Sequence, residues 1–124
     1  MKPSIVYRII SRRLFLSELL SILKTGELHD GAMKHVKAGG KDIMVSRVSG
    51  KYYAIDNHCG HMGGDLSAGK LEGAIVTCPR HGSQWDVTDG HNVRWLRTPG
   101  TTPKVGKINA YPVKVEGDNI LVQI

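Results

Sequence analysis

The sequence is poor in the features that mark several large classes of protein. Only two cysteines occur among its 124 residues, too few for a disulfide-rich framework, although one disulfide stays possible. No apolar run approaches the roughly 18 residues that a membrane-spanning helix needs. No basic stripe interleaves with aromatic residues, which argues against nucleic-acid binding. The composition, 40% hydrophobic and 23% charged, is otherwise that of an ordinary globular domain.

Aromatic residues are also scarce, at 6% of the chain, whereas 15 glycines and 5 prolines make it rich in turns. Val, Ile and Leu must therefore fill most of the core, and frequent turns favour short strands over a helical bundle. Alternating runs predict strands at 33–37, 41–48, 51–55, 74–77, 83–87, 92–95, 108–116 and 120–123. We predict an all-β fold, an antiparallel sandwich or barrel with a hairpin over 43–55 and another turning at Gly117-Asp118-Asn119.

Positive charge is concentrated at the start of the chain. Residues 1–25 contain five basic residues and one acidic residue, out of a net charge of +6. Ser11 can cap a helix, and leucines at positions 16, 19, 20 and 23 repeat with helical spacing. We expect residues 1–26 to be an N-terminal extension with a short amphipathic helix, and residues 27–124 to form the domain.

A short basic motif within this extension bears on localisation. Ser11 to Leu16 reads Ser-Arg-Arg-Leu-Phe-Leu and looks like a twin-arginine export signal. However, Glu18 interrupts the apolar stretch that should follow, Lys24 ends it early, and no small-residue cleavage site is present. We therefore expect a cytoplasmic protein, with export as the alternative.

Both cysteines lie close to a histidine. One residue separates Cys59 from His61, two residues separate Cys78 from His81, and sixteen residues lie between the two pairs. Thiolate and imidazole together suit zinc or iron–sulfur chemistry rather than magnesium or calcium. Structural zinc sites commonly pair Cys with Cys and His with His, whereas each segment here supplies one of each. The mixture suits a binuclear site in which one iron takes both cysteines and the other both histidines, with zinc as the alternative.

The stretch from the first cysteine to Asp86 resembles the Rieske domain pattern, C-x-H-x₁₅₋₁₇-C-x₂-H, and is most similar to the soluble Rieske-type ferredoxins. The resemblance is close over about 57–90. It implies an ISP-domain-like antiparallel sandwich with a cluster-binding subdomain of two loops. It also implies one Rieske [2Fe–2S] cluster per chain, with the cysteines on one iron and the histidines on the other. The implied ligands are Cys59, His61, Cys78 and His81.

Residues next to the implied ligands are expected to shape their surroundings. Glycines would let the two loops approach the cluster with N–H groups aimed at sulfur, and Leu66 and Pro79 would shield it from water. We interpret His58 as a loop residue and not a ligand, although it adjoins the first cysteine. The other three histidines, His29, His35 and His91, are expected at the surface. The expected surroundings of the cluster comprise Gly60, Gly82, Leu66, Pro79, Ser83 and Trp85.

Two departures from high-potential members of this family bear on the reduction potential. Those members carry an extra cysteine in each loop, joined as a disulfide, but Gly64 and Arg80 stand at the matching places here. They also place a serine and a tyrosine hydroxyl near the cluster sulfurs. Ser83 is retained, whereas Trp85 has no hydroxyl. Because hydrogen bonds to sulfur stabilise the reduced cluster, we predict a potential towards the low end of the Rieske range, roughly −150 to +300 mV.

The resemblance implies a one-electron carrier that transforms no substrate itself and has no catalytic residue. It would pass electrons from a reductase to a terminal oxidoreductase such as an oxygenase. Arg80 would help to dock an acidic protein partner, or it is one solvated charge. Two alternatives remain: the small Rieske-like subunit of a larger oxidoreductase of the nitrite reductase type, and a structural zinc-binding module for protein interaction.

Overall fold

The fold is described by a computed structural model over residues 19–58, 64–80, 82–94 and 107–124. Over these residues the chain is all-β, as predicted, with two short 3₁₀ helices. The helices are η1 (Thr25–Glu27) and η2 (Leu66–Ala68). The strands are β1 (Leu19–Lys24), β2 (Met33–Ala38), β3 (Lys41–Val48), β4 (Lys51–Asp56), β5 (Lys70–Glu72), β6 (Ile75–Thr77), β7 (Gln84–Asp86), β8 (Asn92–Arg94), β9 (Ala110–Tyr111), β10 (Val113–Glu116) and β11 (Asn119–Gln123).

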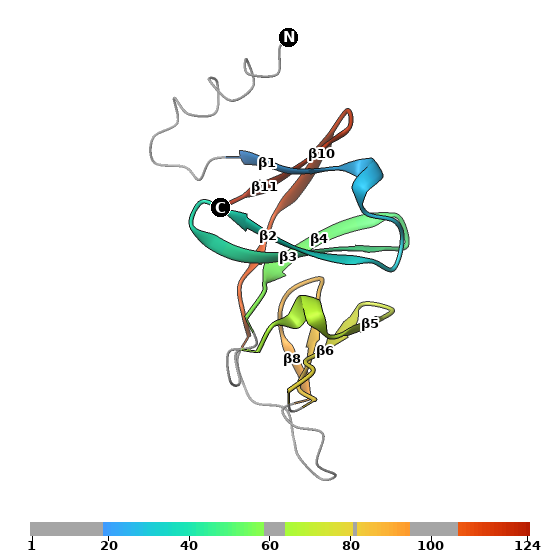
Figure 1. The fold of residues 1–124 in the computed structure, drawn as a ribbon, viewed down its shortest axis with the longest axis vertical. Coiled ribbons are helices and arrows are strands. Elements are labelled where there is room, and N and C mark those ends of the chain that lie inside the picture. Colours follow the sequence, from blue (N-terminus) through green and yellow to red (C-terminus); the bar gives the residue numbers. More distant parts are fainter. Residues whose placement is uncertain (1–18, 59–63, 81, 95–106) are drawn as a thin grey trace.

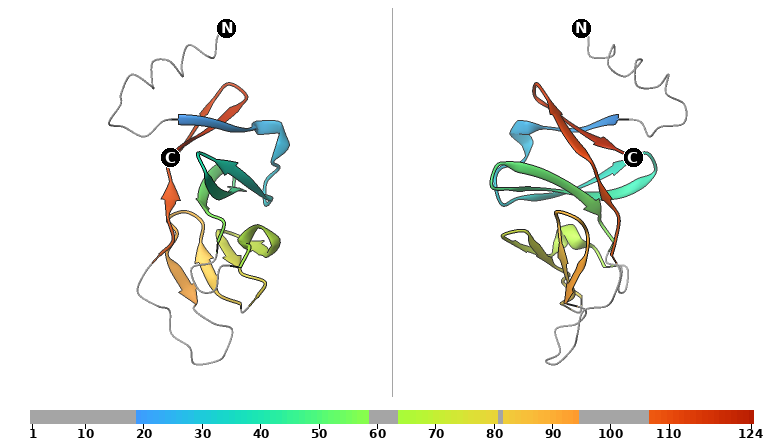
Figure 2. Two further views of the ribbon diagram at one scale, coloured as in Figure 1. Left: turned by 60° about the vertical axis from the view of Figure 1, so that its left-hand side comes forward. Right: turned by 180° about the vertical axis from the view of Figure 1, so that it is seen from behind.

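These strands form antiparallel sheets that follow one another along the long axis of the molecule (Figures 1 and 2). The sheet β1-β11-β10 lies at one end, the sheet β2-β3-β4-β9 in the middle, and the sheet β5-β6-β7-β8 at the other end. Cys78, the predicted ligand that follows β6, therefore belongs to the end formed by β5–β8. No helix in the described part of the chain is long and apolar enough to cross a membrane.

The middle sheet is covered on both of its faces at β3 and β4. Ile43 and Val45 of β3 pack with residues of β1 and β11, whereas Met44, between them, packs against the β5–β8 end. On β4, Ala54 likewise packs with residues of β1 and β11, and Ile55 packs against the β5–β8 end. Successive side chains of a strand point to opposite faces, so an unbroken apolar run is what a doubly covered strand requires. The middle sheet is thus shared by two cores.

The first strand differs from the sequence-based expectation, which was a helix continuing through residues 19–24. Leu19–Lys24 form β1 and pair with β11, so this part of the expected extension belongs to the domain. A bulge between Ser21 and Leu23 places Leu20 and Leu23 opposite Val122 and Ile120, in one core. The bulge brings residues three apart to the same face and so imitates helical spacing. The rest of the expected helix and the twin-arginine motif lie outside the described residues.

Two further differences concern strands. Lys70–Glu72 form β5, which the sequence does not predict, because a three-residue edge strand with one apolar side chain has no recognisable alternation. The run predicted at 108–116 is divided into β9 and β10 at Pro112. Proline has no N–H to donate to a ladder, and here the chain passes from the middle sheet to the sheet that contains β11. The other predicted strands are present, each within two residues of its expected ends.

The chain leaves the middle sheet towards the β5–β8 end, and returns to it, at one place. Asp56 ends β4, and its carboxylate accepts hydrogen bonds from the Asn109 N–H at 2.9 Å and the Tyr111 hydroxyl at 2.6 Å. The Asp56 N–H also donates to the Asn109 carbonyl at 2.9 Å. Burial, together with the neighbouring Asp56 carboxylate, raises the pKa of Tyr111 to about 12, so its hydroxyl stays a donor at all ordinary pH values.

The β3–β4 hairpin offers a test of turn chemistry. Val48 pairs with Lys51, and the two residues between them both have positive φ, 52° at Ser49 and 81° at Gly50. This is the pattern of a type I′ turn, in which asparagine is favoured over serine at the first position. We expect Ser49→Asn to stabilise the protein by about 0.5 kcal/mol. Thermal unfolding measures the gain; Ser49→Val, a β-branched control, should lower the melting temperature, and the opposite order would contradict the turn assignment.

Candidate metal centre

Cys78 is the one predicted ligand among the residues that the structure describes. It follows β6 directly, and its side chain is 2% exposed, in the core between the middle sheet and β5–β8. The other predicted ligands, Cys59, His61 and His81, lie outside the described residues. The structure nevertheless describes the two ends of each segment that carries them. These ends show how each loop is held.

The first loop, residues 58–64, is closed at its base by Asn57. Asn57 is 2% exposed, and both its backbone and its side chain are engaged. Its N–H donates to the Asp42 carbonyl at 3.0 Å, and its carbonyl accepts from the Leu66 N–H at 2.8 Å. Its side-chain amide donates to Asp65 Oδ1 at 2.8 Å and accepts from the Ser67 N–H at 2.9 Å. One buried amide thus joins the two ends of the loop.

Asp65 completes this closure as the N-cap of η2. Its carboxylate accepts from the Ser67 hydroxyl at 2.6 Å and from the Ser67 N–H at 3.1 Å. The Ser67 hydroxyl, followed by the Asn57 amide, holds the pKa of Asp65 below its usual range. His58 and Asp65 also form an isolated backbone bridge. This closure was not predicted from the sequence, although an Asp-x-Ser sequence at the start of a short helix is a recognisable capping signal.

Replacing Asn57 tests this closure. Asn57→Ala removes two side-chain hydrogen bonds at a buried position, and we expect a loss of about 1–3 kcal/mol of folding free energy. Asn57→Asp should destabilise the protein more, because a second carboxylate would face Asp65 Oδ1. Chemical denaturation at neutral pH measures both. Equal stability of Asn57→Ala and wild type would show that the amide does not hold the loop.

The two described ends of the second loop, 78–80 and 82–83, are hydrogen-bonded to each other and to Arg94. The Cys78 N–H donates to the Ser83 carbonyl at 2.7 Å, and the Gly82 N–H donates to the Cys78 carbonyl at 3.1 Å. Gly82 has a φ of 78°, which an L side chain rarely adopts. From β8, the guanidinium of Arg94 donates through Nε and Nη2 to the Gly82 carbonyl at 3.2 and 2.9 Å. This role of Arg94 was not predicted from the sequence.

The two loops meet at Gly64, which is buried. A Cβ atom at Gly64 would lie 2.7 Å from Cys78 Sγ and 3.0 and 3.1 Å from Cδ and Cγ of Arg80. Real Cβ atoms essentially never make a contact as short as the first of these, and the other two are also tighter than most. The end of the first loop therefore lies directly against the cysteine of the second, and no side chain fits between them. Gly64 and Arg80, the positions where high-potential relatives are expected to have bridging cysteines, face each other here.

The remaining predicted neighbours are divided between core and surface. Leu66 and Trp85 pack in the same core as Cys78, and Ser83 is fully buried. Pro79 is exposed, at the rim of an open hollow of about 430 Å³ beside Cys78. Gly60 lies outside the described residues. Leu66 is therefore better placed than Pro79 to shield Cys78 from water.

The histidines that the sequence analysis places at the surface are exposed in the structure. His35 and His58 both contact the Asp42 carboxylate, at 2.8 and 3.2 Å. These two contacts, His35 first, hold the pKa of Asp42 below its usual range. The other two, His29 and His91, contact the Asp30 carbonyl at 3.1 Å and the Asp89 carboxylate at 2.6 Å. Four of the six histidines are therefore engaged away from Cys78.

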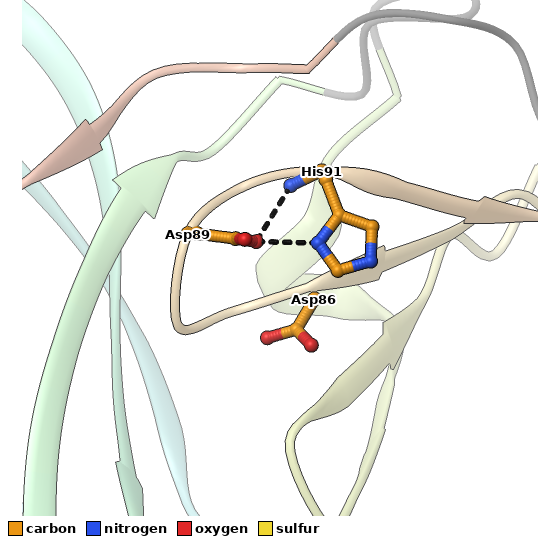
Figure 3. A group of neighbouring side chains, drawn as sticks. All are labelled: Asp86, Asp89 and His91. Atoms are coloured by element: carbon orange, nitrogen blue, oxygen red, sulfur yellow. Dashed lines mark hydrogen bonds and ion pairs between the residues drawn. The ribbon is translucent and has the colours of Figure 1, made fainter.

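A second group of ligand-type side chains lies in the β7–β8 turn. The side-chain ligand atoms of Asp86, Asp89 and His91 lie within 4.8 Å of one another (Figure 3). Asp89 Oδ1 accepts from the N–H of His91 at 3.0 Å and contacts its Nδ1 at 2.6 Å. Asp86 Oδ1 accepts from the N–H and the hydroxyl of Thr88, at 2.8 and 2.5 Å. These bonds stabilise the turn and account for the proximity of the side chains without a metal.

The surroundings of Cys78 fit a sulfur-ligated cluster. The thiol is buried, the approaching backbone is glycine, and a buried serine hydroxyl lies in the same turn. A soft thiolate in a buried setting suits iron–sulfur or zinc and not the hard oxygen-binding cations. The structure thus agrees with the donor chemistry of the predicted site.

Comparisons with known proteins bear on the choice between these metals. The family model of the Rieske [2Fe-2S] domain matches residues 18–112. The chain is 36% identical over 98 residues to the ferredoxin component of the naphthalene 1,2-dioxygenase system of Pseudomonas aeruginosa, covering 79% of this chain and 88% of that protein. It is 31% identical over 106 residues to the ferredoxin component of biphenyl 2,3-dioxygenase of Rhodococcus jostii, covering 86% and 92%.

A solved structure gives the same result for the fold. The ferredoxin of carbazole 1,9a-dioxygenase from Nocardioides aromaticivorans matches with a TM-score of 0.72 and 28% identity, covering 85% of this chain and 96% of that one. The similarity therefore extends well beyond the two Cys-His motifs to the sheets that support them.

Proposed function

Because this chain belongs to the Rieske [2Fe-2S] domain family, we propose that it is a one-electron carrier of the ferredoxin type that passes electrons to an oxygenase. When bound, a Rieske cluster takes up and releases single electrons at a potential set by its protein surroundings. The relatives that support this function are ferredoxin components of dioxygenase systems, and the chain spans most of their length.

The residues that would hold the cluster are Cys59 and Cys78 on one iron and His61 and His81 on the other. The observation that carries this assignment is the burial of Cys78 against Gly64, where the two loops meet. It is supported by the other four histidines, which all contact groups elsewhere. The cluster-binding subdomain would be the unit of about 57–90 that includes η2, β5, β6 and β7.

The residues of the chain prepare the site in three ways. Leu66 and Trp85, in the core beside Cys78, exclude water from one side of it. Asn57 and Asp65 hold the first loop, and the bonds of Cys78 to Ser83 and Gly82 hold the second, so that little has to reorganise when the charge changes. Arg80 is exposed beside the proposed ligand His81, where it can contact an acidic redox partner.

The partner proteins proposed are a reductase that supplies electrons and a terminal oxygenase that consumes them. The purified protein tests the proposal directly. It should be red-brown, contain two irons and two acid-labile sulfides per chain, and give an EPR signal only when reduced by one electron. A colourless protein with one zinc per chain would overturn it in favour of a structural module.

The reduction potential is a separate prediction. Trp85, which supplies no hydroxyl, is buried in the core beside Cys78, while Ser83 keeps one buried hydroxyl in the second loop. With one hydroxyl donor fewer than high-potential relatives, the midpoint should lie below about 0 mV, in the lower part of the Rieske range. A spectroelectrochemical titration at neutral pH measures it, and a midpoint well above about +100 mV would contradict the argument.

We further propose a cytoplasmic location, with export through the twin-arginine motif as the alternative. Cell fractionation of the native source distinguishes the two. Intact chain in the cytoplasmic fraction supports the first, and a shortened chain in an exported fraction supports the second.

A further inference from the structure

Arg94 makes an unusual contact for a residue of a short edge strand. It lies on β8 opposite Gln84 of β7, and its side chain turns back towards the second ligand loop. Two of its N–H groups, Nε and Nη2, donate to a single acceptor, the Gly82 carbonyl, at 3.2 and 2.9 Å. The side chain of Asn92, on the same strand, donates to the carbonyls of Gln84 and Arg94 at 3.0 Å each, which fixes β8 against β7.

The acceptor belongs to the peptide that joins Gly82 to Ser83. A trans peptide is planar, and its N–H points away from its C=O, so holding the Gly82 carbonyl also fixes the direction of the Ser83 N–H. The Ser83 carbonyl, in turn, accepts a hydrogen bond from the Cys78 N–H at 2.7 Å. The guanidinium therefore fixes the peptide on which the buried Ser83 side chain is mounted.

We propose that Arg94 is a positioning residue that sets the reduction potential by fixing the Gly82–Ser83 peptide. The inference rests on the proposed cluster between the two loops. Because this peptide carries the Ser83 side chain, Arg94 also fixes the position from which the Ser83 hydroxyl donates. Donors aimed at the cluster sulfurs favour the reduced state, so Arg94 raises the potential through the Ser83 hydroxyl.

The variants separate position from charge. Arg94→Lys keeps the positive charge but cannot supply the planar fork of two N–H groups, and Arg94→Gln removes both. Lys70→Gln is the matched control, because Lys70 lines the same hollow beside Cys78 and its nearby charged partner is Glu72, at 3.7 Å. The Lys70→Gln substitution removes a positive charge from that hollow and leaves the contacts of the second loop unchanged.

The measurement is the midpoint potential and the reduced-state EPR spectrum of the cluster-loaded protein. We expect Arg94→Lys and Arg94→Gln to lower the equilibrium constant for reduction about tenfold, or about 59 mV for a one-electron couple. We expect Lys70→Gln to shift the midpoint potential by less than about a third of the shift in the Arg94 variants. In a Ser83→Ala background, Arg94→Lys should give a much smaller further shift, because the residues act in series.

Several outcomes would overturn the inference. Equal shifts in Arg94→Gln and Lys70→Gln, with none in Arg94→Lys, would show that charge alone matters. Additive shifts in the double variant would show that Arg94 does not act through Ser83. Loss of the cluster from both Arg94 variants, with Lys70→Gln loaded, would make Arg94 a structural residue only. A wild-type chain without a Rieske spectrum would instead remove the proposed function itself.

Discussion

Alanine in place of His61 or His81 should abolish the Rieske spectrum, whereas alanine in place of His58 should leave it unchanged. The two substitutions are expected to reduce cluster content per chain more than about tenfold, since even residues that only support metal ligands change affinity by that amount. An iron that loses an imidazole is left with an open position in a site built for four protein ligands. Iron and sulfide analysis, together with EPR of the reduced protein, measures the loss.

His58 is the sharpest control because it is next to Cys59 in the chain. Its side chain is 60% exposed and contacts the Asp42 carboxylate at 3.2 Å, on the side of β2 and β3. His91→Ala is a second control, since that ring is bonded to Asp89 in the β7–β8 turn. Loss of the cluster in His58→Ala, with retention in His61→Ala, would move the ligand assignment to His58.

A single methyl group at Gly64 should have nearly as large an effect. The added Cβ of Gly64→Ala would lie 2.7 Å from Cys78 Sγ and would also press on the Arg80 side chain. The sulfur cannot swing away easily, because it is buried in the core with Leu66 and Trp85. The loops must therefore separate, at a cost of about 1–3 kcal/mol for overpacking and about a tenfold loss of cluster content.

Gly26→Ala is the matched control for this substitution. Gly26 lies in η1, a Cβ there would meet nothing within 4 Å, and its backbone is not in the left-handed region. Cluster content and thermal unfolding of both variants are compared with wild type. Full cluster loading in Gly64→Ala would show that the two loops do not meet as closely as this contact requires.

The sequence predicted best those features that depend on residue type and spacing alone. Metal chemistry requires soft and imidazole donors at short separations, so the Cys-His pairs were recognisable without knowledge of the fold. Strands β2, β3 and β4 were predicted from their apolar pattern and turn residues. Strand β1 was not, because its bulge gives Leu20 and Leu23 the spacing of a helix.

The supporting contacts could not be predicted from periodicity. Asn57 and Arg94 act through hydrogen bonds to groups 8 and 12 residues away, and neither lies in a hydrophobic pattern. A buried amide and a guanidinium bonded to a carbonyl look like ordinary loop and strand residues until the acceptor is known. Gly64 was identified as the place of a missing cysteine and as one of the glycines that let the loops approach the cluster, whereas its contact with Cys78 depends on how two loops pack.

The hydrogen bonds of Asp56 to Asn109 and Tyr111 join the two points at which the chain leaves and re-enters the middle sheet. The described part of residues 57–108 is therefore an insertion, here called the cassette, at one edge of a frame formed by the sheets β1-β11-β10 and β2-β3-β4-β9. Such a cassette could be exchanged for that of another electron carrier, or excised and replaced by a short turn. The frame would tolerate the exchange only if the incoming segment covers Met44 and Ile55, the side chains through which frame and cassette share a core.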